Sequence, residues 1–209
     1  MDIRWIIYVL LLHVCTASPE YWSPNVPEWP EVYKACVRFE STREFLTTGW
    51  YVDSHNEWMR LDSYGVPSES NTTYLLDTDD DYACDKLGEP LYMYLYHYSQ
   101  GLQFNIFPAP DPPYVKCTAM KIPKIFLPNP LLPGIQFVRQ ARDNVTTFDH
   151  WKAEYFLFTL DYFFHTESGL PYKMYVETEL FEFLSIESGP LDESVFMLPQ
   201  GVKCTWAET

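Results

Sequence analysis

The sequence predicts a mainly β protein with few short helices. The chain of 209 residues contains 16 tyrosines and 14 phenylalanines, and aromatic and β-branched side chains favour strands. Apolar and polar residues also alternate with a period of two in segments such as VYKACVRFE, as half-buried strands require. Segments of this kind follow one another with turn residues between them, which predicts antiparallel sheets built from short strands.

The first 17 residues have the organisation of a secretory signal peptide. The charged start MDIR precedes the apolar run WIIYVLLLHV, and CTA supplies small residues before a cleavage site after Ala17. The apolar run has about half of the residues that a membrane-spanning helix needs. We therefore expect residues 1–17 to be removed, residues 18–209 to form a single domain without a membrane span, and the protein to be secreted.

The cysteines agree with an oxidising destination. Loss of the leader removes Cys15 and leaves an even number, Cys36, Cys84, Cys117 and Cys204. In a secreted chain this predicts two disulfides, for which three pairings are possible. Two sequons, at Asn71 and Asn144, predict N-glycosylation on the same secretory route.

The formal net charge of −15 restricts the class of partner. Such a surface repels phosphate backbones, which makes nucleic acid an unsuitable partner and favours cations or basic surfaces. The segment DTDDDY is a candidate calcium site, because hard cations prefer carboxylate oxygens. Its candidate ligands are Asp77, Asp79, Asp80 and Asp81. A solvated acidic turn is the alternative, because the segment lacks the glycine and the final glutamate of an EF-hand loop.

A hairpin is predicted between Leu91 and Ile106, where SQG joins LYMYLYHY to LQFNIF. Strand alternation places a stripe of four phenols on one face of its first strand, Tyr92, Tyr94, Tyr96 and Tyr98. The stripe is either a core layer whose hydroxyls reach the rim of the sheet or one wall of a cavity for an amphipathic ligand. Alternation alone does not say which face points inward.

The second half of the chain contains a proline-rich connection and further strands. Eight prolines between Pro108 and Pro133 predict a long packed loop or lid, anchored at Cys117, in place of a helix or central strand. The segments HWKAEYFLFTLDYFFH and YKMYVETELFEFLSI then predict two long strands joined by a turn at ESG. Within the first, YFLFTLDYFF is apolar on both faces, which predicts a second layer or an oligomer interface.

The sequence contains no G-x-S-x-G, H-E-x-x-H, paired C-x-x-C or P-loop motif, and its histidines are isolated. We therefore expect a protein that is not an enzyme and requires no cofactor, with calcium as the one metal to consider. Near the C-terminus, in GPLDESVFMLPQGVKC, Asp192 is expected to cap a short turn that packs down Val195 and Phe196.

Several motifs follow one another along the chain in a defined order. They are YACDKL, the strand LYMYLYHYSQGLQFNI, VKC with the proline-broken IPKIFLP, a tryptophan-led strand and SIESGPLDESVFMLP before Cys204. In these motifs the chain resembles the ependymin family of secreted glycoproteins over most of Asp81 to Cys204. Its N-terminal PEWPEVY and EWMRLDSYG are similar to the pro-segments of invertebrate cathepsin-like proteases. Both relatives resemble bacterial periplasmic lipoprotein carriers of the LolA-like superfamily. This resemblance implies two stacked, strongly curved antiparallel sheets, a half-barrel or sandwich, around a hydrophobic pocket.

The resemblance also implies pairings and a function. It pairs Cys117 with Cys204, which leaves Cys36 for Cys84. It implies a non-enzymatic protein that binds a fatty acid or lipid between its sheets, with calcium binding, extracellular matrix association and dimerisation as family properties. The candidate pocket residues are Tyr92, Tyr94, Tyr96, Phe156 and Phe158. The alternative is an interaction protein, either a protease inhibitor similar to a pro-segment or a signalling factor with an acidic surface.

Overall fold

The structure is a computed structural model that describes residues 26–41, 45–64, 84, 87–109, 115–126, 130–131, 134–144, 146–155 and 158–207. Its strands, in chain order, are β1 (Val32–Glu40), β2 (Phe45–Asp53), β3 (Trp58–Ser63), β4 (Tyr92–His97), β5 (Leu102–Pro108), β6 (Val115–Lys121), β7 (Gln136–Arg142), β8 (Thr147–Tyr155), β9 (Phe158–His165), β10 (Pro171–Val176), β11 (Glu179–Ser188) and β12 (Thr205–Trp206). A short 3-10 helix, η3 (Glu193–Phe196), precedes β12. No helix in the described part of the chain is both long and apolar enough to cross a bilayer.

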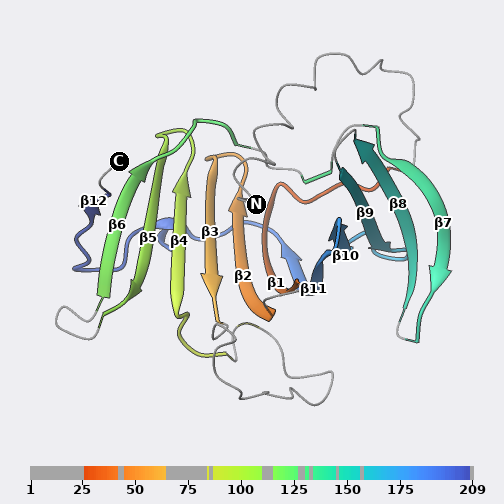
Figure 1. Cartoon of the computed structure of the whole chain (residues 1–209), viewed down its shortest axis with the longest axis horizontal. Coiled ribbons are helices and arrows are strands. Elements are labelled where there is room, and N and C mark those ends of the chain that lie inside the picture. Colours follow the sequence, from red (N-terminus) through yellow and green to blue (C-terminus); the bar gives the residue numbers. More distant parts are fainter. Residues whose placement is uncertain are drawn as a thin grey trace.

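All these strands belong to one open sheet with the order β12-β6-β5-β4-β3-β2-β1-β11-β10-β9-β8-β7 (Figure 1). Strands β1 to β6 form one meander and β7 to β11 a second, and antiparallel pairing of β1 with β11 joins the two meanders. Among the strands that the structure describes, only β12 pairs in parallel, with β6. The predicted mainly β, strongly curved half-barrel is confirmed, but the described strands form one continuous open sheet where two stacked sheets were expected.

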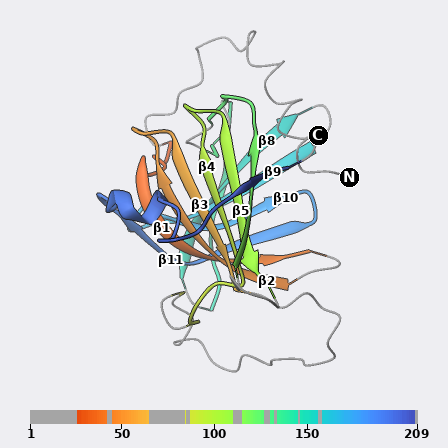
Figure 2. The same cartoon turned by 90° about the vertical axis from the view of Figure 1, so that its left-hand side faces the viewer.

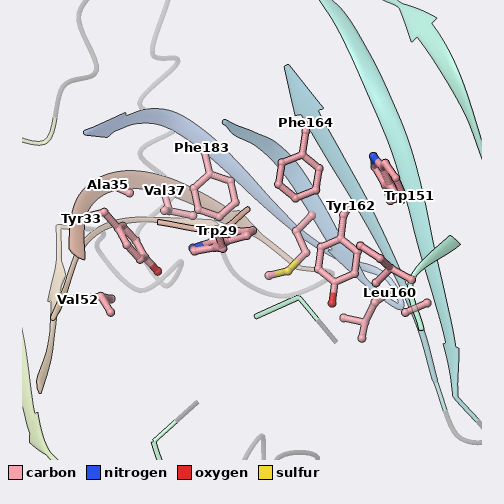
Figure 3. Close-up of a cluster of buried hydrophobic side chains, with 13 residues drawn as sticks. Trp29, Tyr33, Ala35, Val37, Val52, Trp151, Leu160, Tyr162, Phe164 and Phe183 are labelled. Carbon is pink, nitrogen blue, oxygen red and sulfur yellow. The ribbon is translucent and has the colours of Figure 1, made fainter. Parts of the chain in front are cut away.

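The sheet curves around one large hydrophobic core (Figure 3). The buried members of this core are Trp29, Tyr33, Ala35, Val37, Val52, Ile135, Trp151, Ala153, Leu160, Tyr162, Phe164, Met174 and Phe183. They come from strands of both meanders, so burying them holds the curvature, and each large side chain contributes about 1.5–3 kcal/mol. Trp29, just before β1, lies between Phe164 and Phe183 with ring centroids 6.0 and 5.4 Å away. We call this side of the sheet the inner face and the opposite side the outer face.

The sheet is also strongly twisted. In the side view, β8, β9 and β10 run at a steep tilt to β3, β4 and β5 (Figure 2). Each strand of a sheet rotates relative to the next, so the rotation accumulates across many strands. The twist and the curvature together let one sheet enclose the hydrophobic core that two sheets were expected to share.

The prediction of two long strands after residue 146 is wrong, because each of those segments is a hairpin. Strands β8 and β9 pair with Tyr155 opposite Phe158, and β10 and β11 pair with Val176 opposite Glu179. In the second turn Glu177 has a φ of 58°, a left-handed conformation typical of tight hairpins. A hairpin changes which residues face inward, from odd numbers in β8 to even numbers in β9. That change explains why YFLFTLDYFF is apolar at consecutive positions.

The proline-rich connection differs from its prediction in one part and agrees in another. Residues 115–121 form strand β6 between β5 and β12, because the stretch between Pro113 and Pro123 is free of proline and can complete a hydrogen-bonded ladder. After β6, Phe126 and Leu131 pack over the inner face and contact the core. Tyr162 Oη donates a hydrogen bond of 2.7 Å to the carbonyl oxygen of Pro130. The described residues after β6 are therefore packed against the core, in agreement with the prediction for this part of the connection.

The C-terminal segment covers the outer face of the first meander. Asp192 caps η3 by accepting a hydrogen bond of 2.8 Å from the Ser194 backbone N–H, as predicted. Phe196 is only 1% exposed and packs on Trp58 of β3 with ring centroids 5.7 Å apart. His97 Nε2 lies 2.9 Å from the Phe196 carbonyl oxygen. The segment is thus a structural clamp on the sheet.

Both predicted disulfides are present. Cys36 is bonded to Cys84 with their Cα atoms 5.5 Å apart, and Cys117 is bonded to Cys204 with a Cα–Cα distance of 4.4 Å. The second bond fastens the clamp to β6. Disulfides of this structural kind form in oxidising compartments.

Candidate binding site

The tyrosine stripe of β4 points to the inner face. Tyr96 lies opposite Met59 of β3, Met59 opposite Val52 of β2, and Val52 opposite the core residue Tyr33. Directly opposed residues of neighbouring strands point to the same side of a sheet. Tyr92 and Tyr94, at alternate positions of the same strand, therefore share the face of the hydrophobic core. The question that alternation left open is answered by this register.

The outer side of the same strands is already covered. Leu95 is fully buried there with Ile106 and Cys117, and the clamp residues Leu198 and Val202 pack against this group. The outer face of strand β4 is therefore covered by the clamp, and its inner face presents the phenol rings. Any ligand of these strands has to approach from the inner face.

The phenols form a platform with amphipathic character, defined here as Tyr92, Tyr94 and Tyr96 and called the tyrosine platform. Tyr92 is 36% exposed, and Tyr94 and Tyr96 are half-buried. Tyr96 stacks on Tyr98 with ring centroids 5.7 Å apart and an angle of 10°, and Tyr98 contacts Phe126 of the covering loop at 5.1 Å. The ring of Tyr96 is therefore positioned through Tyr98 by that loop.

Polar groups accompany the platform. Tyr96 lies opposite Gln103 and Tyr94 opposite Asn105, and Gln103 Nε2 donates a hydrogen bond of 2.6 Å to Asn105 Oδ1. Burial raises the pKa of Tyr94 above its ordinary value, and the neighbouring Tyr92 adds to the rise. The Tyr94 phenol therefore stays neutral at physiological pH, with a hydroxyl that can donate or accept a hydrogen bond.

The remaining candidate pocket residues lie elsewhere. Phe158 also points to the inner face, but it packs against the hydrophobic core from β9, and β3, β2, β1, β11 and β10 separate β9 from β4 in the sheet. Phe156 falls outside the described residues. The structure thus brings three of the five predicted residues together and places a fourth on the same face in the other meander.

The remaining sequence predictions concern modification, metal binding and processing. Asn144 is exposed in the turn between β7 and β8, as an acceptor asparagine must be. Asn71, the acidic residues of DTDDDY and the leader (residues 1–17) fall outside the described residues. Among the residues that are described, no three His, Cys, Asp or Glu side chains come together to hold a metal ion. Calcium binding at Asp77, Asp79, Asp80 and Asp81 stays a prediction.

A cavity of about 550 Å³ lies in the second meander, where sequence reasoning placed no site. Strand β11 pairs with β1 as far as Ser188, whereas its pairing with β10 ends at Glu182 opposite Lys173. Beyond that pair the two strands separate, and the cavity lies in the opening. Pro171, the first residue of β10, has no N–H group to donate to a ladder, and a bulge follows it. The proline in SGLPY was thus the feature of the sequence that could have indicated the opening between these two strands.

Comparison with solved structures shows the fold. An uncharacterized conserved protein from Thermus thermophilus is similar with a TM-score of 0.54 and 8% identity, over 84% of this chain and 90% of that one. MucB is similar with a TM-score of 0.45 and 11% identity, over 81% of this chain and 58% of MucB. PNGF-II has a TM-score of 0.37 and 10% identity, over 85% of this chain and 31% of PNGF-II. The last two similarities are too weak to support an assignment.

No family model and no curated protein sequence matches the chain. At 8% identity the likeness to the Thermus protein establishes a shared architecture and nothing about activity. Evidence about the function therefore comes from the site itself.

Proposed function

We propose that this chain is a secreted, ependymin-like glycoprotein that binds a fatty acid or lipid on the inner face of its curved sheet. One observation carries the proposal. The tyrosine platform continues the inner face beyond the strands whose side chains fill the hydrophobic core, while the outer side of the same strands is sealed by the C-terminal clamp. The platform is therefore an aromatic surface on the concave side of an open sheet.

The chemistry of the platform suits an acyl chain with a polar end. Each methylene group that leaves water contributes about 0.8 kcal/mol, and phenol rings supply flat apolar surface for it. The hydroxyls of Tyr94 and Tyr96, with the amides of Gln103 and Asn105 opposite them, can orient the polar end. The described residues show no comparable apolar approach from the outer side of β4, where Leu95 is covered.

Further properties belong to the same proposal through the family resemblance. They are calcium binding at the DTDDDY segment, association with extracellular matrix, dimerisation and a role without catalysis. Secretion is supported by the two disulfides, which need an oxidising environment. Lipid binding on the tyrosine platform does not depend on any of these properties.

Titration with cis-parinaric acid, a fluorescent fatty acid, tests the proposal. We expect saturable binding that weakens about tenfold in Tyr94→Asp and Tyr96→Asp, because each variant places a carboxylate on the apolar platform. Tyr175→Asp is the matched control, since Tyr175 is half-buried but lies on the outer face of β10. Equal affinity in all three variants, or no saturable uptake by the wild type, contradicts the proposal.

A further inference from the structure

The cavity between β10 and β11 has an apolar floor that continues the hydrophobic core. Phe183 and Pro171 are buried there, and Ile186 packs against the core from β11. Phe183 is itself a core residue with 5% of its surface exposed. An apolar group that enters the cavity therefore meets the inner surface of the sheet, on the side where the tyrosine platform also lies.

The rim of the cavity is polar and carries one charge of each sign. Arg142 stands at the end of β7, and Glu167 lies in the turn between β9 and β10. Both side chains are exposed, and neither forms an ion pair with a residue that the structure describes. Hydroxyl groups of Thr146, Thr147, Ser168 and Ser185 complete the polar lining.

The other titratable groups near the rim are already engaged or neutral. Asp143 accepts hydrogen bonds of 2.8 Å from the Thr146 backbone N–H and from Tyr172 Oη. Thr146 Oγ1 lies 3.1 Å from His165 Nδ1, and burial lowers the pKa of His165, so its ring is neutral at physiological pH. Arg142 and Glu167 are therefore the charges left for a ligand.

From this lining we infer that the cavity binds the head group of a zwitterionic lipid, of the phosphocholine or phosphoethanolamine class. The phosphate would pair with Arg142 and the ammonium group with Glu167, while the hydroxyls would donate hydrogen bonds to the ester oxygens. The first methylenes of the chain would lie on Phe183 and Ile186. A cavity of about 550 Å³ is within the usual range for small-molecule sites.

Ligands with a single charge fit the rim less well. A fatty acid can satisfy Arg142 but leaves Glu167 without a partner and brings a second carboxylate near it. A cationic amphiphile can pair with Glu167 but leaves Arg142 without a partner and brings a second positive charge near it. Only a head group with both charges complements both side chains, which is the reason for naming this class. The inference rests on the proposed function and adds a separate head-group site on the same inner face, in the second meander and apart from the tyrosine platform.

Calorimetric titration of the full chain with myristoyl lysophosphatidylcholine, below its micelle concentration, tests the inference against myristic acid. We expect the lysolipid to bind more tightly, and Arg142→Gln and Glu167→Gln each to weaken it about tenfold. Glu167→Gln should leave myristic acid binding unchanged or improved. The matched controls are Arg139→Gln, an exposed arginine of the same strand, and Glu193→Gln, an exposed glutamate of η3. Both should bind the lysolipid as the wild type does.

Two results separate this inference from the proposed function. Myristic acid that binds as well as the lysolipid, with no effect of Arg142→Gln or Glu167→Gln, overturns the head-group site and leaves the hydrophobic-ligand proposal standing. A wild-type protein that binds neither compound contradicts both.

Discussion

The guanidinium group of Arg60 holds the carboxylate of Asp62 through two parallel hydrogen bonds on the outer face of β3. Nε lies 2.8 Å from Oδ1 and Nη2 lies 2.7 Å from Oδ2, and Asp62 is 1% exposed. The remaining nitrogen, Nη1, donates to the Val195 carbonyl oxygen at 3.0 Å. The pair therefore positions a cation that fastens η3 to the sheet.

Asp62→Asn should destabilise the protein by about 3 kcal/mol. The change leaves Arg60 half-buried without its counter-ion and weakens its hold on Val195, and breaking a buried ion pair from one side costs roughly 3–5 kcal/mol. We place the expectation at the lower end because Arg60 keeps partial contact with water, with 19% of its side chain exposed. Urea unfolding followed by fluorescence measures the difference.

The control for that variant is Lys34→Gln, which removes the exposed pair of Lys34 with Glu187. Surface pairs contribute about 0–1 kcal/mol, so this variant should stay close to the wild type. Equal losses in Asp62→Asn and Lys34→Gln would show that the buried pair is not what holds the clamp.

Removal of the Cys117–Cys204 disulfide should cost about 4–5 kcal/mol. The bond closes a loop with a sequence separation of 87 residues, and the loss of chain entropy in the unfolded state grows with loop length. The double variant Cys117→Ala with Cys204→Ala should also release the segment after η3 to proteases. Guanidinium unfolding and limited proteolysis check both effects, and a wild-type midpoint with an intact C-terminus contradicts the structural role of this bond.

Burial of Tyr33 should make the fold sensitive to alkaline pH. Desolvation raises the pKa of its phenol from 10.0 to about 12, so the unfolded chain loses this proton before the folded chain does. The corresponding stability is complete below pH 10 and is lost as the pH rises towards 12. Between pH 9.5 and 11 the loss from this group is about 1 kcal/mol. Tyr33→Phe should flatten the slope of unfolding free energy against pH over that range, and an unchanged slope counts against burial of the neutral phenol.

Glycosylation at Asn144 should be visible in protein secreted from eukaryotic cells. The side chain is exposed in the turn between β7 and β8, so a glycan there is compatible with the fold. We expect Asn144→Gln to lose the mass of one glycan and Asn71→Gln to lose the mass of another, as measured by intact mass spectrometry. A variant with the wild-type mass shows that its sequon is unused.

Local sequence patterns predict β1, β4 and β5 of the first meander well, but not β6, which lies in the proline-rich segment that was expected to be a loop. The alternation around Tyr92, Tyr94 and Tyr96 and the turn at Gly101 define β4 and β5, because side chains of a strand alternate strictly. That the tyrosine side chains point to the inner face follows only from the strand register through Met59 and Val52. This register is a long-range property that no single strand encodes. The sequence places phenols on one face and the pairing of distant strands decides which face that is.

The second meander was harder to predict for a different reason. The sequence patterns predicted two long strands where the structure has the four strands β8 to β11. Apolar residues continue between Tyr155 and Phe158, and no glycine or proline marks the change of direction there. The cavity with Arg142 and Glu167 depends on where β10 and β11 separate. Those two residues belong to different hairpins, and the pairing of the hairpins sets how closely they approach. Local composition carries no information about such an approach.

Native mass spectrometry of the protein, purified gently from a eukaryotic secreting host, tests whether the inner face carries a bound lipid. We expect a population heavier than the glycosylated polypeptide by the mass of one lipid, released at higher collision energy and identified from the extract. Tyr94→Asp should carry less of this species, and Tyr175→Asp should carry as much as the wild type. A protein that is lipid-free from the start and takes up no added cis-parinaric acid would contradict lipid binding on the inner face.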